Sequence, residues 1–251
     1  MRWQQATQKI ISECIALARL PLKPKSGFRV LSYHSVGGNA FGDHMGLSSI
    51  APELFKKHIT SLLKYKIVGT NDADLNLNQL SVGITFDDGY RDNLYIAAPI
   101  LVANNIPFTI FIATDLVANS ANGFLSPHEL KELSKLPNVT IGAHGKTHTH
   151  LTRLKESQIL NELQDSKSYL EDLLGAPIQS MSYPYGDVDE RVLYAAKVAG
   201  YKNAFTSNFS INNSLTGALK LNRCAILNGD TTRTLAQKIN GDWDWRGILG
   251  A

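Results

Sequence analysis

The sequence predicts an α/β fold built from parallel strand–helix units. Short runs of β-branched and aromatic residues alternate with amphipathic segments of about 10 to 19 residues that have helical spacing. Strands separated by helices of that length favour parallel pairing over an all-β fold. The 251 residues are enough for one domain of barrel size with a full hydrophobic core, and no internal repeat divides them.

The first half of the chain alternates strands with helices. The predicted strands cover residues 30–35, 81–86 and 108–113, and the predicted helices cover residues 52–65 and 93–104. The strand segments are rich in β-branched and aromatic residues, whereas residues 52–65 repeat apolar side chains at the three- and four-residue spacing of a helix. This order predicts β/α units with buried strands.

The second half continues the alternation, with recognisable helix ends. Ser126 is a predicted N-cap, with Glu129 at the third helical position as in a capping box. A strand is predicted at residues 139–142. Helices are predicted at residues 156–174 and 189–199, and each is followed by a glycine, the residue that most often ends a helix.

Composition and charge are those of a soluble globular protein. Apolar residues make up 43% of the chain and charged residues 19%. A net charge of +3 is too small to indicate nucleic-acid binding, and the basic residues form no stripe with interleaved aromatics. No stretch approaches the ~20 apolar residues of a membrane span. Cys14 and Cys224 are the only cysteines, so pairing and redox compartment stay open.

The N-terminal residues predict an amphipathic helix. Its apolar residues recur at helical spacing as Ile10, Cys14, Leu17 and Pro21, or as Ile11, Ile15 and Ala18. Its basic residues are Arg2, Lys9, Arg19, Lys23 and Lys25. We favour a helix that packs on the barrel, and a helix on a membrane surface is the alternative. Because no apolar run has the form of a signal-peptide core, we expect the cytoplasm or the cytoplasmic face of the membrane, with export as the alternative.

Two adjacent carboxylates, Asp87 and Asp88, follow the predicted strand at residues 81–86. In an extended strand, neighbouring side chains point to opposite faces. Gly89 ends the strand there, so the backbone can twist both carboxylates toward one pocket. Two ionised carboxylates this close repel each other unless a cation lies between them. One carboxylate would then bind the cation, and the other would stay free as a general base.

Two histidines, His144 and His148, follow the predicted strand at residues 139–142. Their spacing of four places both rings on one side if the loop takes a helical turn, and His150 would point elsewhere. In barrels of alternating strands and helices, catalytic residues collect at the C-terminal ends of the strands. One Asp oxygen and two imidazole nitrogens are a ligand set typical of a hydrolytic metal site with a position open for water.

Three segments resemble the motifs of the polysaccharide deacetylases, also called NodB-homology or carbohydrate esterase family 4 enzymes. They are residues 85–89, 144–148 and 182–186. The resemblance runs from about residue 28 to about residue 226, and it implies a distorted (β/α)7 barrel of the NodB type. It also implies hydrolysis of N-acetyl groups on sugars of the N-acetylglucosamine type. The expected domains are therefore the N-terminal helix at residues 1–27 and a catalytic domain at residues 28–251.

The same resemblance implies a role for each motif residue. The implied metal ligands are Asp88, His144 and His148, which would hold one divalent ion, usually Zn2+, with Co2+, Ni2+ or Mn2+ as alternatives. Asp87 would be the catalytic base, and the backbone N–H of Tyr185 would help to hold the oxyanion. The predicted substrate contacts are Tyr90, Tyr183 and Pro184.

The sequence departs from the family pattern at two points. Ser182 stands where many members carry an Arg that braces the base, and Arg223 is a candidate substitute. The C-terminal Leu-x-His motif that supplies the general acid is missing. His34, at the end of the strand at residues 30–35, resembles the Tyr-His segment of the circularly permuted poly-N-acetylglucosamine deacetylases, in which this His is the acid. We therefore predict His34 as the general acid, and a buried structural His is the alternative.

The predicted function is metal-dependent removal of N-acetyl groups from an N-acetylated sugar or polysaccharide of the N-acetylglucosamine type. A deacylase or deformylase of a lipid-linked sugar would use the same site, because the pocket beyond the metal selects the substrate. A non-catalytic glycan-binding barrel is the third alternative, favoured by the two departures and opposed by the intact carboxylates and histidines. The loop at residues 37–44 is a candidate wall of a sugar groove, with a plain connection as the equal alternative. Its Asp43 and His44 are a candidate second metal pair, but we favour solvated loop residues. Trp243 and Trp245 are candidates for stacking on sugar, but we favour aromatics that pack on the barrel.

Overall fold

The computed structural model describes residues 2–19, 26–40, 42–72, 75 and 79–248. The main sheet consists of β1 (Gly27–Tyr33), β4 (Lys66–Ile67), β5 (Leu80–Phe86), β6 (Phe108–Ile112), β7 (Val139–Ala143), β8 (Ser180–Ser182), β9 (Asn203–Phe205) and β10 (Cys224–Ala225). A small second sheet pairs β2 (Ser35–Val36) with β3 (Ser49–Ile50).

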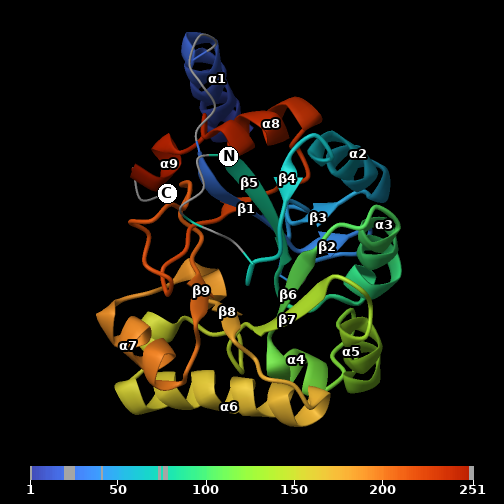
Figure 1. Ribbon diagram of the computed structural model, residues 1–251, viewed down its shortest axis with the longest axis vertical. Helices are drawn as coiled ribbons and strands as arrows, with labels where there is room; N and C mark the ends of the chain where they lie inside the picture. Colours follow the sequence, from blue (N-terminus) through green and yellow to red (C-terminus); the bar gives the residue numbers. More distant parts are fainter. Residues whose placement is uncertain (1, 20–25, 41, 73–74, 76–78, 249–251) are drawn as a thin grey trace.

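The described residues also form helices. They are α1 (Arg2–Arg19), α2 (Pro52–Leu62), α3 (Ala98–Ala103), α4 (Thr114–Ala118), α5 (Pro127–Ser134), α6 (Glu156–Leu174), α7 (Glu190–Val198), α8 (Thr232–Asn240) and α9 (Trp245–Ile248). Shorter turns are the π-helical Asn93–Ala97 and the 3-10 turns Leu151–Arg153 and Pro184–Gly186. Figure 1 shows α4 to α7 around the lower half of the sheet and α2 and α8 around the upper half.

The strands of the main sheet are parallel and curl into a barrel-like surface. Their order is β10-β1-β5-β6-β7-β8-β9, and β4 also pairs with β5. The edge strands, β9 and β10, approach each other at one point. There the segment just before β10 bonds to β9: the backbone N–H of Thr206 donates to the carbonyl of Leu221, and the N–H of Leu221 donates to the carbonyl of Ala204. The predicted distorted β/α barrel is therefore confirmed, with β1 between the last strand of the chain and β5.

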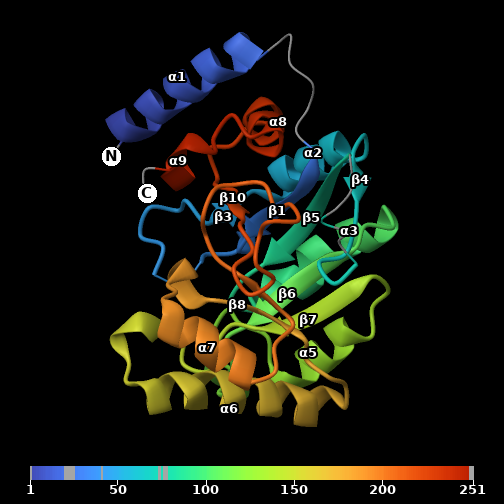
Figure 2. The same cartoon turned by 60° about the vertical axis from the view of Figure 1, so that its left-hand side comes forward.

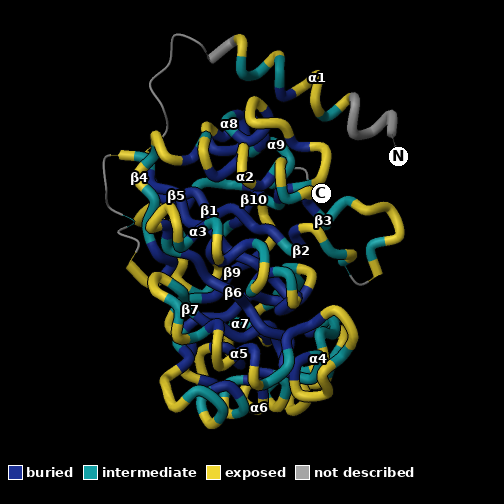
Figure 3. The backbone as a smooth tube through the Cα atoms, turned by 90° about the vertical axis from the view of Figure 1, so that its right-hand side faces the viewer, coloured by how far each residue is buried: buried dark blue, intermediate teal, exposed yellow. Residues whose placement is uncertain are grey.

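The strands are buried on both faces, as expected for parallel strands covered by helices. All seven residues of β1 are buried, and the rings of Tyr33, Phe55 and Phe86 pack against one another at centroid distances of 5.4 to 5.9 Å. Figure 3 shows this buried backbone as a continuous dark interior beneath exposed helices and loops. Such a core holds the strand ends rigidly, which is what an active site at those ends requires.

Most predicted elements are confirmed, and the helix expected at residues 93–104 differs in form. It begins as the π-helical turn Asn93–Ala97 and continues as α3 from Ala98. Pro99 explains the change, because proline has no N–H to donate to the preceding turn and its ring crowds the carbonyl there. Helix α6 matches the predicted residues 156–174, and Gly175 ends it in the left-handed conformation with φ +66°.

The predicted capping box of α5 is confirmed, and it allows a stability test. The Ser126 side chain accepts from the backbone N–H of Glu129, whose carboxylate accepts from the backbone N–H of Ser126. Replacing Ser126 by Ala should lower the free energy of unfolding by about 1 kcal/mol, measured by urea denaturation. The control is Ser134→Ala in the last turn of the same helix, which should change it by less than about 0.5 kcal/mol. Equal effects of the two substitutions would contradict the role of the cap.

The N-terminal helix lies outside the barrel, across α8 and α9 (Figure 2). Pro21, Lys23 and Lys25, which the sequence adds to its pattern, lie outside the described residues. The domain boundary expected near residue 27 stays a prediction. Cys14 is exposed and Cys224 buried, and both are free thiols. Among the described residues, no helix has the length and the apolar composition needed to cross a bilayer.

Candidate active site

Asp87 and Asp88 lie where β5 ends. The backbone N–H of Asp87 donates to Tyr33 on β1 at 3.0 Å, which extends the strand pairing by one residue. Asp88 then adopts the left-handed conformation with φ +74°, and Gly89 follows with φ +86°. This reversal turns the second carboxylate toward the same cavity as the first, as the sequence indicated. The conformation is uncommon for a residue with a Cβ, so surrounding contacts must maintain it.

Asp87 is held by a buried arginine fork. Nη1 of Arg223 donates to Oδ1 of Asp87 at 2.7 Å, and Nη2 donates to Oδ2 at 2.8 Å. Nη2 also donates to Oγ of Ser182 at 2.6 Å, and Arg223 as a whole is only 1% exposed. Arg223 therefore occupies the position that the sequence proposed for it, and Ser182 accepts from it. Ser32 on β1 adds a weaker contact to Asp87 at 3.4 Å.

The charges around Asp87 keep it ionised. Burial by itself would raise the pKa of its carboxyl, but the positive charges of Arg223 and His144 outweigh burial and lower that pKa from its usual value. The carboxylate is therefore available to accept a proton at neutral pH. The fork fixes both of its oxygens, so its orientation is set before any substrate arrives.

Asp88, His144 and His148 gather at one point. One ligand atom from each lies within 4.8 Å of the other two. The Nε2 atoms of His144 and His148 are 3.4 and 3.2 Å from Oδ1 of Asp88, which is buried and has no hydrogen-bond partner among the described residues. An orphaned carboxylate oxygen facing two imidazoles fits a divalent cation, which would bind all three atoms.

The surroundings of His144 prepare it as a ligand. Its Nδ1 lies 2.8 Å from the carbonyl oxygen of Ser182, so Nδ1–H donates there and Nε2 is the ring nitrogen that faces Asp88. Burial would lower the pKa of His144, but Asp87 and Asp88 raise it overall. Burial would also raise the pKa of Asp88, yet the two imidazoles hold it well below its usual range. The negative charge of Asp87 and Asp88 therefore favours a cation at this cluster.

The loop that carries the histidines does not form the helical turn that their spacing suggested. Gly145 and His148 are left-handed, with φ +69° and +56°. The N–H groups of Lys146 and Thr147 donate to the carboxylate of Glu162 on α6, at 2.9 and 3.0 Å, and so do not form helical hydrogen bonds. The two rings still meet, with centroids 4.9 Å apart. Glu162 was not predicted, because the contact joins segments 15 residues apart.

A cavity of about 400 Å³ brings the predicted residues together. It is lined by His34, Asp87, Asp88, Tyr90, His144, His148, Tyr183 and Tyr185. Pro184 is buried and does not line it. Ala40, Gly42 and Asp43 form part of the wall, as expected for the loop at residues 37–44, of which Phe41 lies outside the described residues. The placement agrees with the sequence, and the chemical roles stay predictions.

His34 is half-buried at the cavity wall, directly after β1, and is not the fully buried structural His of the alternative. Its carbonyl accepts from Nδ2 of Asn93 at 2.8 Å. The neighbouring Asp92 accepts from Oγ of Ser35 at 2.6 Å and from the backbone N–H of Val36 at 3.0 Å. Asp92 and Asn93, at the start of the π-helical turn, therefore hold the segment that carries His34 in place. Nothing in the sequence pattern indicated these two residues as supports.

His150 lies outside the metal-ligand group and does not line the cavity, as its sequence position suggested, but it supports a residue that does. Its ring stacks on Tyr185, with centroids 4.0 Å apart and an interplanar angle of 12°, and its Nδ1 lies 3.4 Å from Asp187. Tyr185 has φ +60°, and its ring is also close to His148, at 4.7 Å. The stack therefore supports a strained residue whose backbone N–H is the predicted oxyanion donor.

This stack leads to a prediction for His150. Replacing His150 by Ala removes the ring under Tyr185 and should lower kcat/KM about two- to tenfold, the equivalent of roughly 0.5–1.5 kcal/mol. His150→Phe keeps a flat ring but loses the contact with Asp187, and it should restore most of the loss. Steady-state kinetics on a soluble substrate measure both. A Phe variant as impaired as the Ala variant would assign the effect to the Asp187 contact instead.

Other polar candidates have structural partners. The carboxylate of Asp43 accepts the backbone N–H groups of Met45 and Ser48, and the triad above is the one metal-ligand group found among the described residues. Trp243 is buried, and Nε1 of Trp245 donates to Ser12, so both pack internally. These contacts leave no observation in favour of a second metal pair or of sugar stacking by the tryptophans.

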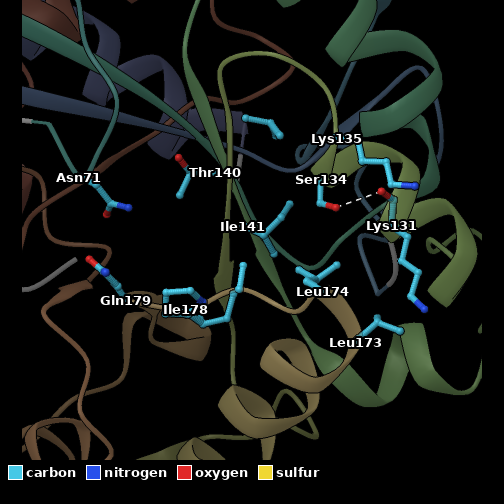
Figure 4. Close-up of a pocket in the computed structure, with 13 residues that line it drawn as sticks. Asn71, Lys131, Ser134, Lys135, Thr140, Ile141, Leu173, Leu174, Ile178 and Gln179 are labelled. Atoms are coloured by element: carbon cyan, nitrogen blue, oxygen red, sulfur yellow. Dashed lines mark hydrogen bonds between the residues drawn. The ribbon is translucent and has the colours of Figure 1, made fainter.

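A second cavity, of about 620 Å³, lies beside the N-terminal ends of β7 and β8 (Figure 4). It is lined by the start of β7, by Gln179 just before β8 and by parts of α5 and α6, including Lys131 and Lys135. Both lysines are exposed, and no carboxylate or histidine lines the cavity. It therefore lacks the groups that hydrolysis requires.

Residues 74–204 match the family model described as Polysaccharide deacetylase. The Bacillus subtilis protein YxkH is 29% identical over 187 residues, which are 71% of this chain and 63% of YxkH. The poly-beta-1,6-N-acetyl-D-glucosamine N-deacetylase of Staphylococcus aureus is 33% identical over 141 residues, 50% of this chain and 47% of that enzyme. The chain thus spans less than two thirds of either relative.

The fold also matches a solved structure. The Streptococcus pyogenes deacetylase PplD, in complex with acetate, superposes with a TM-score of 0.76 at 24% identity, covering 86% of this chain and 99% of that one. At this level of identity the match concerns the fold. It agrees with the curled parallel sheet described above.

Proposed function

The chain belongs to the polysaccharide deacetylase family, and from this premise we propose that it removes N-acetyl groups from polymers of the N-acetylglucosamine type. One observation carries the proposal: an ionised carboxylate, Asp87, is locked by Arg223 beside a cluster of one carboxylate and two imidazoles. A non-catalytic glycan-binding barrel would not require a fixed general base beside that cluster. Amide hydrolysis needs both a base and a site for positive charge.

Asp88, His144 and His148 are the residues that would hold a divalent metal. One carboxylate oxygen and two imidazole nitrogens are a mixed ligand set that suits Zn2+ and also Co2+, Ni2+ or Mn2+. When bound, such an ion supplies Lewis acidity toward the acetyl carbonyl and lowers the pKa of water. The hydrogen bond from His144 to the carbonyl of Ser182 keeps the ligating nitrogen correctly oriented.

Other residues of the cavity carry out the proton transfers and stabilise the developing charge. Asp87 accepts the proton of the attacking water, and Arg223 holds its two oxygens in place while keeping the carboxylate ionised. The backbone N–H of Tyr185 donates to the oxygen that becomes negative when the carbonyl is attacked. His34, across the same cavity, donates a proton to the departing sugar amine. Acetate and the free amine are the products.

The cavity supports a sugar substrate. Tyr185 is 57% exposed at its wall, and an exposed aromatic face can stack on a sugar ring. Tyr183 is fully buried and its hydroxyl donates to Leu219, whereas Tyr90 stacks on Phe124 at 4.8 Å, so these two shape the wall. The similarity to the Staphylococcus aureus poly-beta-1,6-N-acetyl-D-glucosamine N-deacetylase favours a β-1,6-linked polymer over other glycans.

Two alternatives remain to be separated by experiment. A non-catalytic glycan-binding barrel was favoured by the missing Arg in the third motif, and the Arg223–Asp87 pair supplies an equivalent support. A deacylase or deformylase of a lipid-linked sugar would use the same residues. The acyl group that is released and the glycan that is accepted therefore distinguish the deacetylase from a deacylase or deformylase of a lipid-linked sugar.

A substrate panel tests the proposal. Purified protein with added Zn2+ or Co2+ is incubated with β-1,6- and β-1,4-linked N-acetylglucosamine oligomers and with an N-formyl sugar, and released acid and free amine are measured. We expect acetate release that is fastest on the β-1,6-linked oligomers. Formate release without acetate release would replace the deacetylase by a deformylase. Metal binding without release from any substrate would support the binding barrel.

A further inference from the structure

Helix α1 is attached to the rest of the chain through its polar side. Oγ of Ser12 accepts from Nε1 of Trp245 at 3.1 Å, and the carboxylate of Glu13 accepts from Arg233 at 2.9 and 2.5 Å. Lys9 donates to a main-chain carbonyl in the turn before α8 at 3.1 Å. These three residues of α1 share one side of the helix, because they are spaced by three and four positions. That side faces α8 and α9 (Figure 2).

The apolar side of α1 therefore faces away from the barrel. Ile10 is 64% exposed, Leu17 is 59% exposed and Cys14 between them is exposed. These residues, at i, i+4 and i+7, form one stripe, and Ile11 beside it is 39% exposed. An amphipathic helix on a globular protein normally turns such a stripe toward the core. Figure 3 shows exposed residues recurring along α1.

Positive charge is concentrated in the same part of the sequence. Residues 1–25 contain five basic side chains and one acidic one, whereas the remaining 226 residues contain 20 basic and 21 acidic ones. The acidic residue of the first group, Glu13, is already paired with Arg233 on the polar side. The segment thus combines an outward apolar stripe with a net charge of +4, in a chain that is otherwise nearly neutral.

The apolar stripe and the positive charge together favour a lipid surface over a second copy of the chain as the binding partner of α1. A stable dimer buries roughly 800 Å² on each partner, and three exposed aliphatic side chains on one short helix provide much less. A net charge of +4 would also repel the same segment of a second copy. A bilayer with anionic headgroups instead attracts basic side chains and accepts an apolar stripe to the depth of a single helix.

We propose that α1 is an interfacial anchor that lies along an anionic bilayer surface, with the stripe of Ile10, Cys14 and Leu17 in contact with the acyl chains. The polar side of the helix stays on α8 and α9, so the barrel is held at the surface without a membrane-spanning segment. This inference is independent of the reaction that the active site catalyses.

Vesicle flotation tests the anchor with the whole protein. The probes are vesicles of phosphatidylcholine alone and vesicles with about 30% phosphatidylglycerol, each at low salt and at 0.5 M salt. We expect binding to the anionic vesicles that weakens at high salt, because the electrostatic attraction is screened. The variant Ile10→Ser/Leu17→Ser should bind at least tenfold more weakly. Leu215→Ser, which changes a residue that is 92% exposed elsewhere, is the matched control and should bind like the unmodified protein.

Two further measurements keep the outcome unambiguous. The urea denaturation midpoint of Ile10→Ser/Leu17→Ser should match that of the unmodified protein, which shows that the variant is folded whatever reaction the active site catalyses. A fluorophore on Cys14, the exposed thiol, should shift to the blue on anionic vesicles, whereas Cys224 is buried and stays unlabelled. Equal vesicle binding by variant and control would overturn the proposal. So would a concentration-dependent dimer that the variant abolishes, without any vesicle binding.

Discussion

Replacing Asp87 by Asn is expected to lower kcat about 10²- to 10⁴-fold, the usual contribution of a positioned general base. Asn has the shape of Asp but cannot accept a proton from water at neutral pH. Because Asp87 is not one of the three clustered ligands, the variant should still bind one equivalent of Zn2+ or Co2+. The measurements are steady-state acetate release and metal content by elemental analysis.

The control for this substitution is another carboxylate of the same cavity. Asp43 lines the wall, and its oxygens accept backbone N–H groups of its own loop. The two hydrogen bonds end on different oxygens of Asp43, so the single amide oxygen of Asp43→Asn can keep one of them. Asp43 takes part in no proton transfer, so kcat should stay within about threefold of the unmodified protein. Normal turnover by Asp87→Asn, with metal bound, would remove Asp87 from the role of base.

Replacing Arg223 by Met should impair both stability and catalysis. Arg223 and Asp87 are 1% and 4% exposed, and removing one partner of such a pair leaves the other charge buried. The expected loss in the free energy of unfolding is about 3–5 kcal/mol, measured by urea denaturation. Catalysis should fall as well, because the carboxylate of Asp87 loses the fork that orients it and the charge that lowers its pKa.

A double-variant cycle separates these two effects. The variant Asp87→Asn/Arg223→Met has no unpaired buried carboxylate, so it should be more stable than Arg223→Met although it is inactive. Arg223→Lys keeps a positive charge without the two-pronged geometry, and it should show intermediate stability and low turnover. If Arg223→Met had the stability and kcat of the unmodified protein, the fork would have no part in the site.

The elements and the centre of the site follow from local patterns. Strand segments predicted by residue type, separated by amphipathic helices, were enough to indicate a parallel β/α barrel. Because parallel strands end at one rim, Asp87 and Asp88 after β5 and His144 after β7 were expected to meet, and they do. Arg223 was named only as a candidate substitute for the Arg missing from the third motif, and the folded chain shows its fork on Asp87.

The supports of the site were not predictable in the same way. The histidine loop depends on Glu162 of α6, and the support of Tyr185 depends on the ring of His150. Both involve non-glycine residues at positive φ, namely His148 and Tyr185, for which residue type offers no signal. The outward apolar stripe of α1 was expected only under the membrane-surface alternative, because a helical pattern shows an apolar face but not the side on which the barrel lies.

The central claim is that Asp88, His144 and His148 hold the metal on which deacetylation depends. The most direct measurement is acetate release from N-acetylglucosamine oligomers by chelator-treated protein, titrated with Zn2+, Co2+, Ni2+ or Mn2+, beside a His144→Ala variant. The account predicts that activity returns with one equivalent of metal and that His144→Ala neither binds the ion tightly nor recovers turnover. Full activity after chelation, or in His144→Ala, would contradict it.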